Sequence, residues 1–233
     1  MAICVANVDN IPADQINALH SHVDLFRATM CVDDLLKSAA LLRIVQELDA
    51  LCASQWVVGF HFTRAIRESI LKDGLVIKPG ADRRDQFIAE FGHRFTEEQL
   101  QRIKRAWQDY FPGQQDRSRN GRVCLALTRE ALANGGADPL LRYFGGEAIY
   151  MPLLEFTDVA KILGSLGEPL IVQCALDPTR SKAYYEFPWG TVWLSSYHCS
   201  VNPNARQLDQ DVSALYSIPA ADIISVSRPG AGV

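Results

Sequence analysis

A histidine and a threonine at the end of an apolar run are the first residues of this 233-residue chain that could do chemistry. The run reads Trp-Val-Val-Gly-Phe-His-Phe-Thr, so His61 and Thr63 are two positions apart. Alternate side chains of a β-strand lie on one face, and a strand therefore places both on the same side. If the strand is buried, both side chains need partners, which either the protein or a ligand supplies. A histidine in such a place is more often structural than functional. A functional role for His61 therefore depends on which other residues can lie near it.

Two further groups follow in the sequence. Arg122 comes after Gly121 and opens an apolar segment, behind a polar loop over 114–121. Glu147 follows Gly145-Gly146 and precedes the apolar run 148–151, which predicts a strand. A carboxylate in this position lies at a sheet edge, where glycines leave room for a ligand. The ordinary alternatives are a solvated arginine beside a turn and a loop acid.

The motifs of several enzyme classes are missing from the sequence. It contains no Gly-x-Gly-x-x-Gly after a strand, no Walker loop, no His-Glu-x-x-His and no Gly-x-Ser-x-Gly. The five histidines have no zinc-ligand spacing, and the six cysteines are scattered without a Cys-x-x-Cys pair. We therefore expect no metal site and free thiols in a reducing compartment. Metalloenzymes, nucleotide kinases and serine hydrolases are disfavoured.

From the composition we expect a soluble protein of the cytoplasm. Export into a target cell is an alternative. Hydrophobic residues make up 48% of the chain and the formal charge is -4. Length and pattern predict a helical N-terminal segment over 1–55 packed on a core domain over 56–233. No apolar run has membrane length, and the start lacks a secretory signal. The acidic balance argues against a nucleic-acid partner and for a protein partner.

The order of elements is α+β rather than a strict alternation of strand and helix. A strand over 56–62 and a helix ending at Asp73-Gly74 come first in the core. Thr96 and Gln99 form a capping box that begins a helix. Other expected helices cover 14–26, 33–53, 82–91 and 156–163, and other expected strands cover 122–127, 148–151, 170–176, 191–194 and 223–226.

These pieces together resemble a known enzyme family. Phe60-His61-Phe62-Thr63, followed by Ile66, Ile70 and Gly74-Leu75, is similar to the first motif of bacterial ADP-ribosyltransferase toxins and effectors, including those that target DNA. Three further features follow in the family's order: a strand that begins at Gly121-Arg122, a strand that begins after Glu147, and the ending Ile218–Ile224. The resemblance covers short islands between 56 and 227. It implies an ADP-ribosyltransferase-like split β-sheet core.

The resemblance also implies roles for particular residues. Glu147 would be the catalytic carboxylate. His61 would hold the adenosine-side ribose of NAD, and Thr63 would contact the nicotinamide end or fix the histidine tautomer. Arg84 or Arg83 would balance the pyrophosphate, with Arg122 as the competitor. Thr128 is the only hydroxyl in the second-motif strand, where the family usually places a tyrosine or serine at the nicotinamide.

The implied function is NAD-dependent mono-ADP-ribosyl transfer, with NAD as co-substrate and a protein as the preferred acceptor. Arg117 and Arg119, in the polar loop, would guide the acceptor. Gly145 stands where arginine-modifying members carry a second acid, so arginine is not the expected acceptor. An NAD glycohydrolase, an RNA 2′-phosphotransferase on the same fold and a non-catalytic interaction protein are the alternatives.

Overall fold

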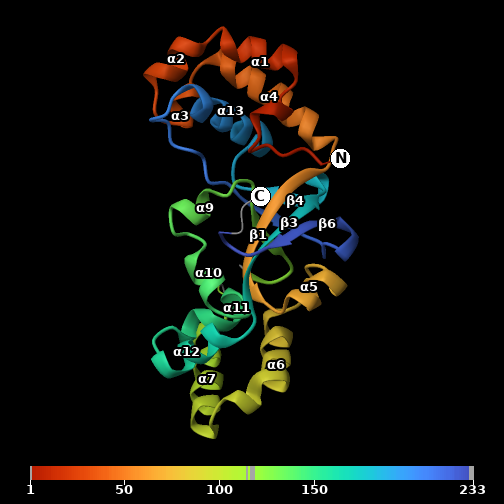
Figure 1. Ribbon diagram of the computed structural model, residues 1–233, viewed down its shortest axis with the longest axis vertical. Helices are drawn as coiled ribbons and strands as arrows, with labels where there is room; N and C mark the ends of the chain where they lie inside the picture. The colour runs from red at the N-terminus through yellow and green to blue at the C-terminus, as the bar shows by residue number, and fades with distance from the viewer. Residues whose placement is uncertain (1, 114, 116–118, 231–233) are drawn as a thin grey trace. The chain divides into compact units, whose positions relative to one another are not determined.

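The computed structural model describes residues 2–113, 115 and 119–230 (Figure 1). It combines helices with one open six-stranded sheet, which confirms the expected mixture of helices and strands. Where we expected a split sheet, the described strands form a single one in the order β4-β5-β2-β1-β3-β6. The strands are β1 (Val57–Ala65), β2 (Val123–Ala126), β3 (Glu168–Leu176), β4 (Ser181–Ala183), β5 (Asp211–Ala214) and β6 (Ile223–Ser227).

The sheet is antiparallel where its pairing is defined in detail. β1 and β2 are antiparallel, with Phe60 opposite Ala126, and β4 and β5 are antiparallel, with Lys182 opposite Ser213. β1 and β3 are longer than the sequence predicted, but they begin and end around the expected apolar runs. The central strands are correctly predicted because buried strands are continuous apolar segments between turns.

The chain divides into two compact units. The first comprises 1–60, 124–134 and 173–214, and the second comprises 61–123, 135–172 and 215–233. The chain crosses the boundary inside β1, β2 and β3. The predicted N-terminal segment over 1–55 thus shares a unit with two later parts of the chain.

The first unit is built on two long helices that pack side by side (Figure 1). These are α4 (Ala39–Ala53) and α13 (Pro188–Val201). Gly190 lets them approach closely, because an added Cβ would lie 2.1 Å from the Val45 carbonyl oxygen. The unit also contains η1 (Val8–Asn10), α1 (Ala13–His20), α2 (Val23–Ala28), α3 (Val32–Leu35), α9 (Glu130–Ala133) and η4 (Pro178–Arg180).

Helix α13 corrects one prediction. The expected strand over 191–194 lies inside this helix, whose residues Trp189 to His198 are all buried. A helix buried on every side has no polar face, so its sequence loses the 3.6-residue period that distinguishes it from a strand. Asp49 of α4 accepts hydrogen bonds from the Trp189 and Gly190 N–H groups at 2.8 and 3.1 Å and so caps the helix from outside.

The far end of α13 is tied to α2. His198 Nε2 lies 2.8 Å from the Thr29 carbonyl oxygen, and Asn202 Nδ2 donates to the same oxygen at 2.7 Å. Both side chains are buried, and Phe26 packs edge-on against Tyr197 with ring centroids 5.0 Å apart. The carbonyls that α2 leaves open at its end thereby bond His198 Nε2 and Asn202 Nδ2, whereas His198 Nδ1 has no hydrogen-bond partner among the described residues.

The second unit has a helical, aromatic-rich core. Its first helix, α5 (Arg67–Asp73), ends at Gly74 with φ +75°, as predicted. Helix α7 (Glu97–Tyr110) begins with the predicted Thr96–Gln99 capping box. The other elements are α6 (Gly80–Phe91), η2 (Gly92–Arg94), α10 (Asp138–Arg142), α11 (Glu147–Tyr150), η3 (Met151–Leu153), α12 (Thr157–Ser165) and η5 (Ala220–Asp222).

Aromatic side chains from α6, α7 and α11 meet in this core. Phe87 stacks edge-on with Trp107 at 6.0 Å between centroids, and Trp107 Nε1 donates to the Ile149 carbonyl at 2.9 Å. Ile149, Tyr150 and Leu153 are buried in the same cluster. The core therefore fixes α11, which begins with Glu147, against α6 and α7.

Gly190→Ala should lower the free energy of unfolding by about 1–3 kcal/mol, the usual cost of overpacking. The methyl group would meet the Val45 backbone, which cannot rotate away as a side chain can. Gly164→Ala in α12 is the matched control. Its nearest atom would be 3.6 Å away, so helix propensity should leave stability unchanged or raise it by up to about 1 kcal/mol. Urea unfolding measures both, and equal effects would contradict the close approach of α4 and α13.

Asp49→Asn tests the external cap through its pH dependence. Burial raises the pKa of the Asp49 carboxyl above its ordinary value, against the opposing effect of the Gly190 and Trp189 N–H groups. The folded state then binds this proton more tightly than the unfolded state, so the contribution of Asp49 to stability falls as pH rises from about 4 through the raised pKa. Asparagine does not titrate. The unfolding free energy of wild type minus that of the variant should therefore decrease over this window, and an increase would show that the N–H bonds outweigh burial.

Candidate functional site

The second half of β1 carries the predicted histidine and threonine. His61 is half-buried and Thr63 is buried, while Phe62 between them is buried in the opposite direction. The strand continues beyond the expected end to Ala65. His61 and Thr63 thus lie on one face of a buried strand, as their spacing predicted.

Arg64 joins this strand to two other segments of the second unit. Its Nε donates to the Leu166 carbonyl at 2.7 Å and its Nη2 to the Gly167 carbonyl at 3.2 Å. Its backbone carbonyl accepts a hydrogen bond from Gly145 N–H at 3.2 Å, and Arg64 forms a parallel bridge with Phe144. Burial lowers the pKa of the Arg64 guanidinium. The residue therefore places the segment before Glu147 beside the end of the strand that carries His61 and Thr63.

Two glycines shape the chain at this point. Gly145 and Gly146 have φ values of +87° and +72°, a region that favours glycine. At Gly145 an added Cβ would also lie 2.6 Å from Ile149, whereas at Gly146 nothing lies within 4 Å. The turn therefore needs glycine for its backbone, and the space beside Gly146 is open.

Glu147 does not lead a strand, which corrects the prediction for 148–151. It is the first residue of the short helix α11. The apolar run is a continuous stretch that periodicity cannot assign, and the burial of Ile149, Tyr150 and Leu153 follows a helical spacing. Packing against the aromatic core of the second unit favours the helix.

Glu147 forms an ion pair with Arg119. Arg119 Nε donates to Glu147 Oε2 at 3.0 Å, and the side chains are 18% and 44% exposed, respectively. Tyr150 is the last residue of the same helix. Burial and the charge of Glu147 raise the pKa of its hydroxyl, whereas the charge of Arg119 lowers it. Arg119 was predicted to guide an acceptor, whereas its pairing with Glu147 was missed, because 28 residues separate the two in sequence. Arg117 lies outside the described residues.

Arginines and aromatic rings continue this site toward α6 and α7. Arg84 lies over the Phe111 ring at 4.4 Å, Tyr110 packs edge-on against Phe111 at 5.0 Å, and Arg119 lies 6.0 Å over Tyr110. Asn120 Oδ1 accepts from Gly80 N–H at 2.7 Å at the start of α6. The structure thus links Arg84 with Arg119 and Glu147 through one aromatic pair.

The other predicted residues are placed differently. Arg83 of α6 donates to the Val76 carbonyl at 2.6 Å, and burial lowers the pKa of its guanidinium, so it ties α6 to the segment that precedes the helix. Arg122 is half-buried, and its Nε finds no hydrogen-bond partner among the described residues. Thr128 belongs to the first unit, where its buried hydroxyl accepts from Glu130 N–H at 3.2 Å. Its role at the nicotinamide stays a prediction.

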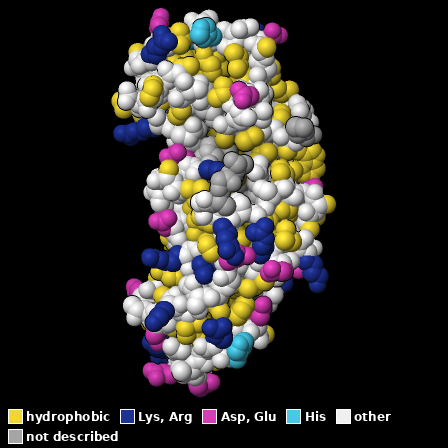
Figure 2. All heavy atoms as spheres, viewed as in Figure 1, with side chains coloured by type: hydrophobic (Ala, Val, Ile, Leu, Met, Phe, Trp, Pro, Cys, Tyr) yellow, Lys and Arg dark blue, Asp and Glu magenta, His cyan; other side chains and the backbone are white. Residues whose placement is uncertain are grey.

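Charged side chains of both signs cover the visible face over α6, α7 and α12 (Figure 2). Arg102 of α7 pairs with Asp158 of α12, which also accepts from Gln99 at 2.8 Å. These exposed contacts tie the two helices together. Over this part of the visible face, basic and acidic side chains are interspersed (Figure 2).

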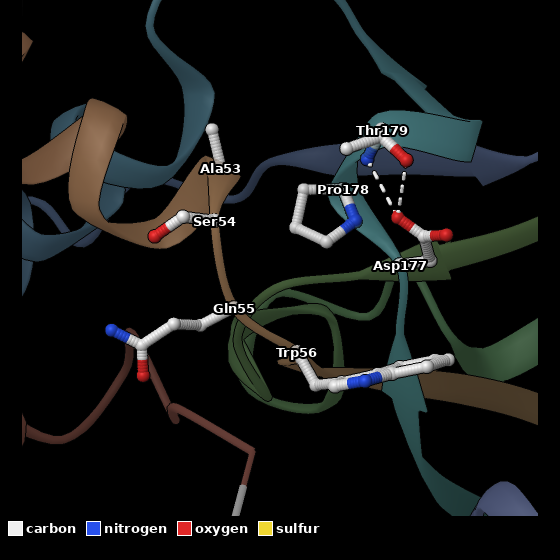
Figure 3. Close-up of a pocket in the computed structure, with 7 residues that line it drawn as sticks. All are labelled: Ala53, Ser54, Gln55, Trp56, Asp177, Pro178 and Thr179. Carbon is white, nitrogen blue, oxygen red and sulfur yellow. Dashed lines mark hydrogen bonds between the residues drawn. The ribbon is translucent and has the colours of Figure 1, made fainter.

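Two cavities are defined in the first unit. One, of about 250 Å³, lies between the α4–β1 turn and η4, where half-exposed Trp56 faces Pro178 and Asp177 accepts from Thr179 (Figure 3). The other, of about 280 Å³, is lined by α4 residues and by Tyr185, Glu186 and Phe187. Neither is lined by a predicted site residue.

Comparison with protein-family models, with curated proteins and with solved structures gives no match. The site therefore has to be interpreted from its own chemistry. Within the part of the chain that the structure describes, no cluster of three His, Cys, Asp or Glu side chains is arranged to hold a metal. Over the same residues, no helix has the length and apolarity to cross a bilayer. None of the six cysteines, all of which the structure describes, forms a disulfide, and Cys124 is exposed.

Arg64→Lys should destabilise the protein by about 2 kcal/mol, since hydrogen bonds to charged groups contribute about 1.5–3 kcal/mol each. A lysine carries its N–H donors on a single nitrogen. It therefore cannot bond the Leu166 and Gly167 carbonyls from two separate nitrogens, as a planar guanidinium does. Arg94→Lys, at an exposed position in η2, is the control and should change stability by less than about 0.5 kcal/mol. Thermal unfolding of both variants provides the measurement. Equal stability would mean that Arg64 does not anchor β1.

Proposed function

We propose that the chain is an NAD-dependent ADP-ribosyltransferase with Glu147 as its catalytic carboxylate. The observation that carries the proposal is the single parallel bridge between Arg64 and Phe144, with its hydrogen bond from Gly145 N–H to the Arg64 carbonyl. It brings a glutamate to the end of the strand on which a half-buried histidine and a buried threonine share one face. The arginine–aromatic cluster beside Glu147 adds cations for a diphosphate and flat surfaces for rings.

The reaction asks few groups to act. The bond between the ribose C1′ and the nicotinamide nitrogen breaks, and nicotinamide leaves as a neutral molecule. A nucleophile of the acceptor forms the new bond to C1′ and gives up its proton. Positive charge develops on the ribose in between, so a carboxylate placed beside the ribose stabilises the transition state more than the ground state.

Each proposed residue then has a defined task. Glu147 accepts a hydrogen bond from a ribose hydroxyl and faces the developing charge. His61 and Thr63 hold the nucleotide from β1, and Arg84 binds the diphosphate beside Phe111. The proposal departs from the family pattern in three respects. The described strands form one sheet rather than a split one, Thr128 stands where the family usually has tyrosine or serine, and Glu147 begins a helix rather than a strand. A protein remains the preferred acceptor.

Glu147→Gln should retain NAD binding and lower ADP-ribosyl transfer by at least about 100-fold, the size of effect seen when a group that stabilises transition-state charge is removed. His61→Ala should instead weaken NAD binding. Glu155→Gln and His93→Ala are matched controls, because both residues are exposed. The assay follows adenine-labelled NAD in bacterial and eukaryotic lysates, with binding measured by thermal shift.

The products separate the competing activities. Label on a macromolecule together with free nicotinamide supports transfer. Free ADP-ribose without a labelled macromolecule would indicate an NAD glycohydrolase. An unchanged melting temperature with NAD and no nicotinamide release would refute the proposal and favour an interaction protein. Full transfer by Glu147→Gln would refute the role of that residue alone.

A further inference from the structure

Arg119 is the fixed partner of its ion pair. Only 18% of its side chain is exposed. Its Nη1 donates to the Gln115 backbone carbonyl at 3.2 Å and also to the Gln115 side-chain oxygen. Its guanidinium lies 6.0 Å over the Tyr110 ring. Contacts other than the one with Glu147 therefore hold the guanidinium in place.

Glu147 is the partner that can move. Its side chain is 44% exposed, and the contact with Arg119 engages one carboxylate oxygen, Oε2. It stands at the start of a four-residue helix, directly after two glycines with positive φ. A rotation of this side chain requires no change in the buried residues of α11.

A diphosphate group suits Arg119 better than one carboxylate does. It carries more negative charge and can accept two parallel hydrogen bonds from a guanidinium. Arg84 provides a second guanidinium across the Tyr110–Phe111 pair. The Glu147 carboxylate contacts Arg119 through one oxygen, whereas a diphosphate offers several oxygens to the same guanidinium.

We infer that Glu147 acts as an internal anion that occupies Arg119 in the free chain, and that a ligand diphosphate replaces it there and releases its carboxylate toward the ribose. The assignment of the ribose rests on the proposed function, whereas the exchange of anions at Arg119 does not. Binding of the diphosphate then prepares the carboxylate for its task. A ligand without a diphosphate leaves Glu147 paired with Arg119. The site therefore discriminates between ligands, because only a ligand with a diphosphate frees the carboxylate.

The test uses inorganic pyrophosphate, the full chain and isothermal titration calorimetry at low ionic strength. Arg119→Ala should bind pyrophosphate at least about tenfold more weakly, because a charge-assisted bidentate contact is lost. Glu147→Gln should bind it about two- to fivefold more tightly, since a partly exposed ion pair no longer competes. Arg105→Ala and Glu155→Gln make the same charge changes at exposed positions and should stay within about twofold of wild type.

Two outcomes would overturn the exchange. Arg119→Ala could bind pyrophosphate as Arg105→Ala does, or Glu147→Gln could bind it more weakly than wild type. Arg119→Lys, which keeps the charge but not the planar geometry, should give an intermediate affinity and serves if the alanine variant does not fold. The expected pattern without any NAD turnover would support the exchange and refute the transferase. Transfer activity together with an unaffected Arg119→Ala would do the opposite.

Discussion

The hydrogen bonds of Arg64 are the interaction on which the site depends most. Its side chain bonds backbone carbonyls at the entry to β3, and its own carbonyl receives the N–H of Gly145. One residue thus joins β1, β3 and the turn before α11. Because its side-chain partners are main-chain oxygens, the arrangement is set by backbone geometry rather than by the particular side chains at those positions. These acceptors compensate the partly buried guanidinium for the water that it loses on folding.

The turn over Gly145 and Gly146 connects this anchor to the candidate catalytic carboxylate. The chain leaves the bridge with Arg64, passes through two residues of positive φ and begins α11 with Glu147. The aromatic core holds α11 from below through the Trp107–Ile149 hydrogen bond, and Arg119 holds Glu147 from the side. The carboxylate is therefore positioned by groups from α7, from the segment before β2 and from β1. These groups are distant in sequence, and each acts through a different kind of contact.

The sequence predicted features that depend on neighbouring residues. The capping box of α7, the glycine that ends α5 and the shared face of His61 and Thr63 are all correct, because each follows from local geometry. The strands expected over 148–151 and 191–194 are helical instead. Both runs are apolar without a polar face, so the choice is made by tertiary partners such as Trp107 and Asp49. The pairing of Arg119 with Glu147 was beyond prediction for the same reason. Patterns within a segment cannot report a partner that folds in from elsewhere.

The packing of α13 on α4 has a consequence for how the protein is made. The apolar face of α4 leaves the ribosome well before α13 has been synthesised, since Ala53 and Pro188 are far apart in the sequence. At translation rates of about 5–20 residues per second, the wait lasts roughly 7–27 seconds. During that time the nascent N-terminal helices expose a surface that only a late segment can cover. The yield of this unit in the cell therefore depends on how well that surface is kept from aggregating until the chain is complete.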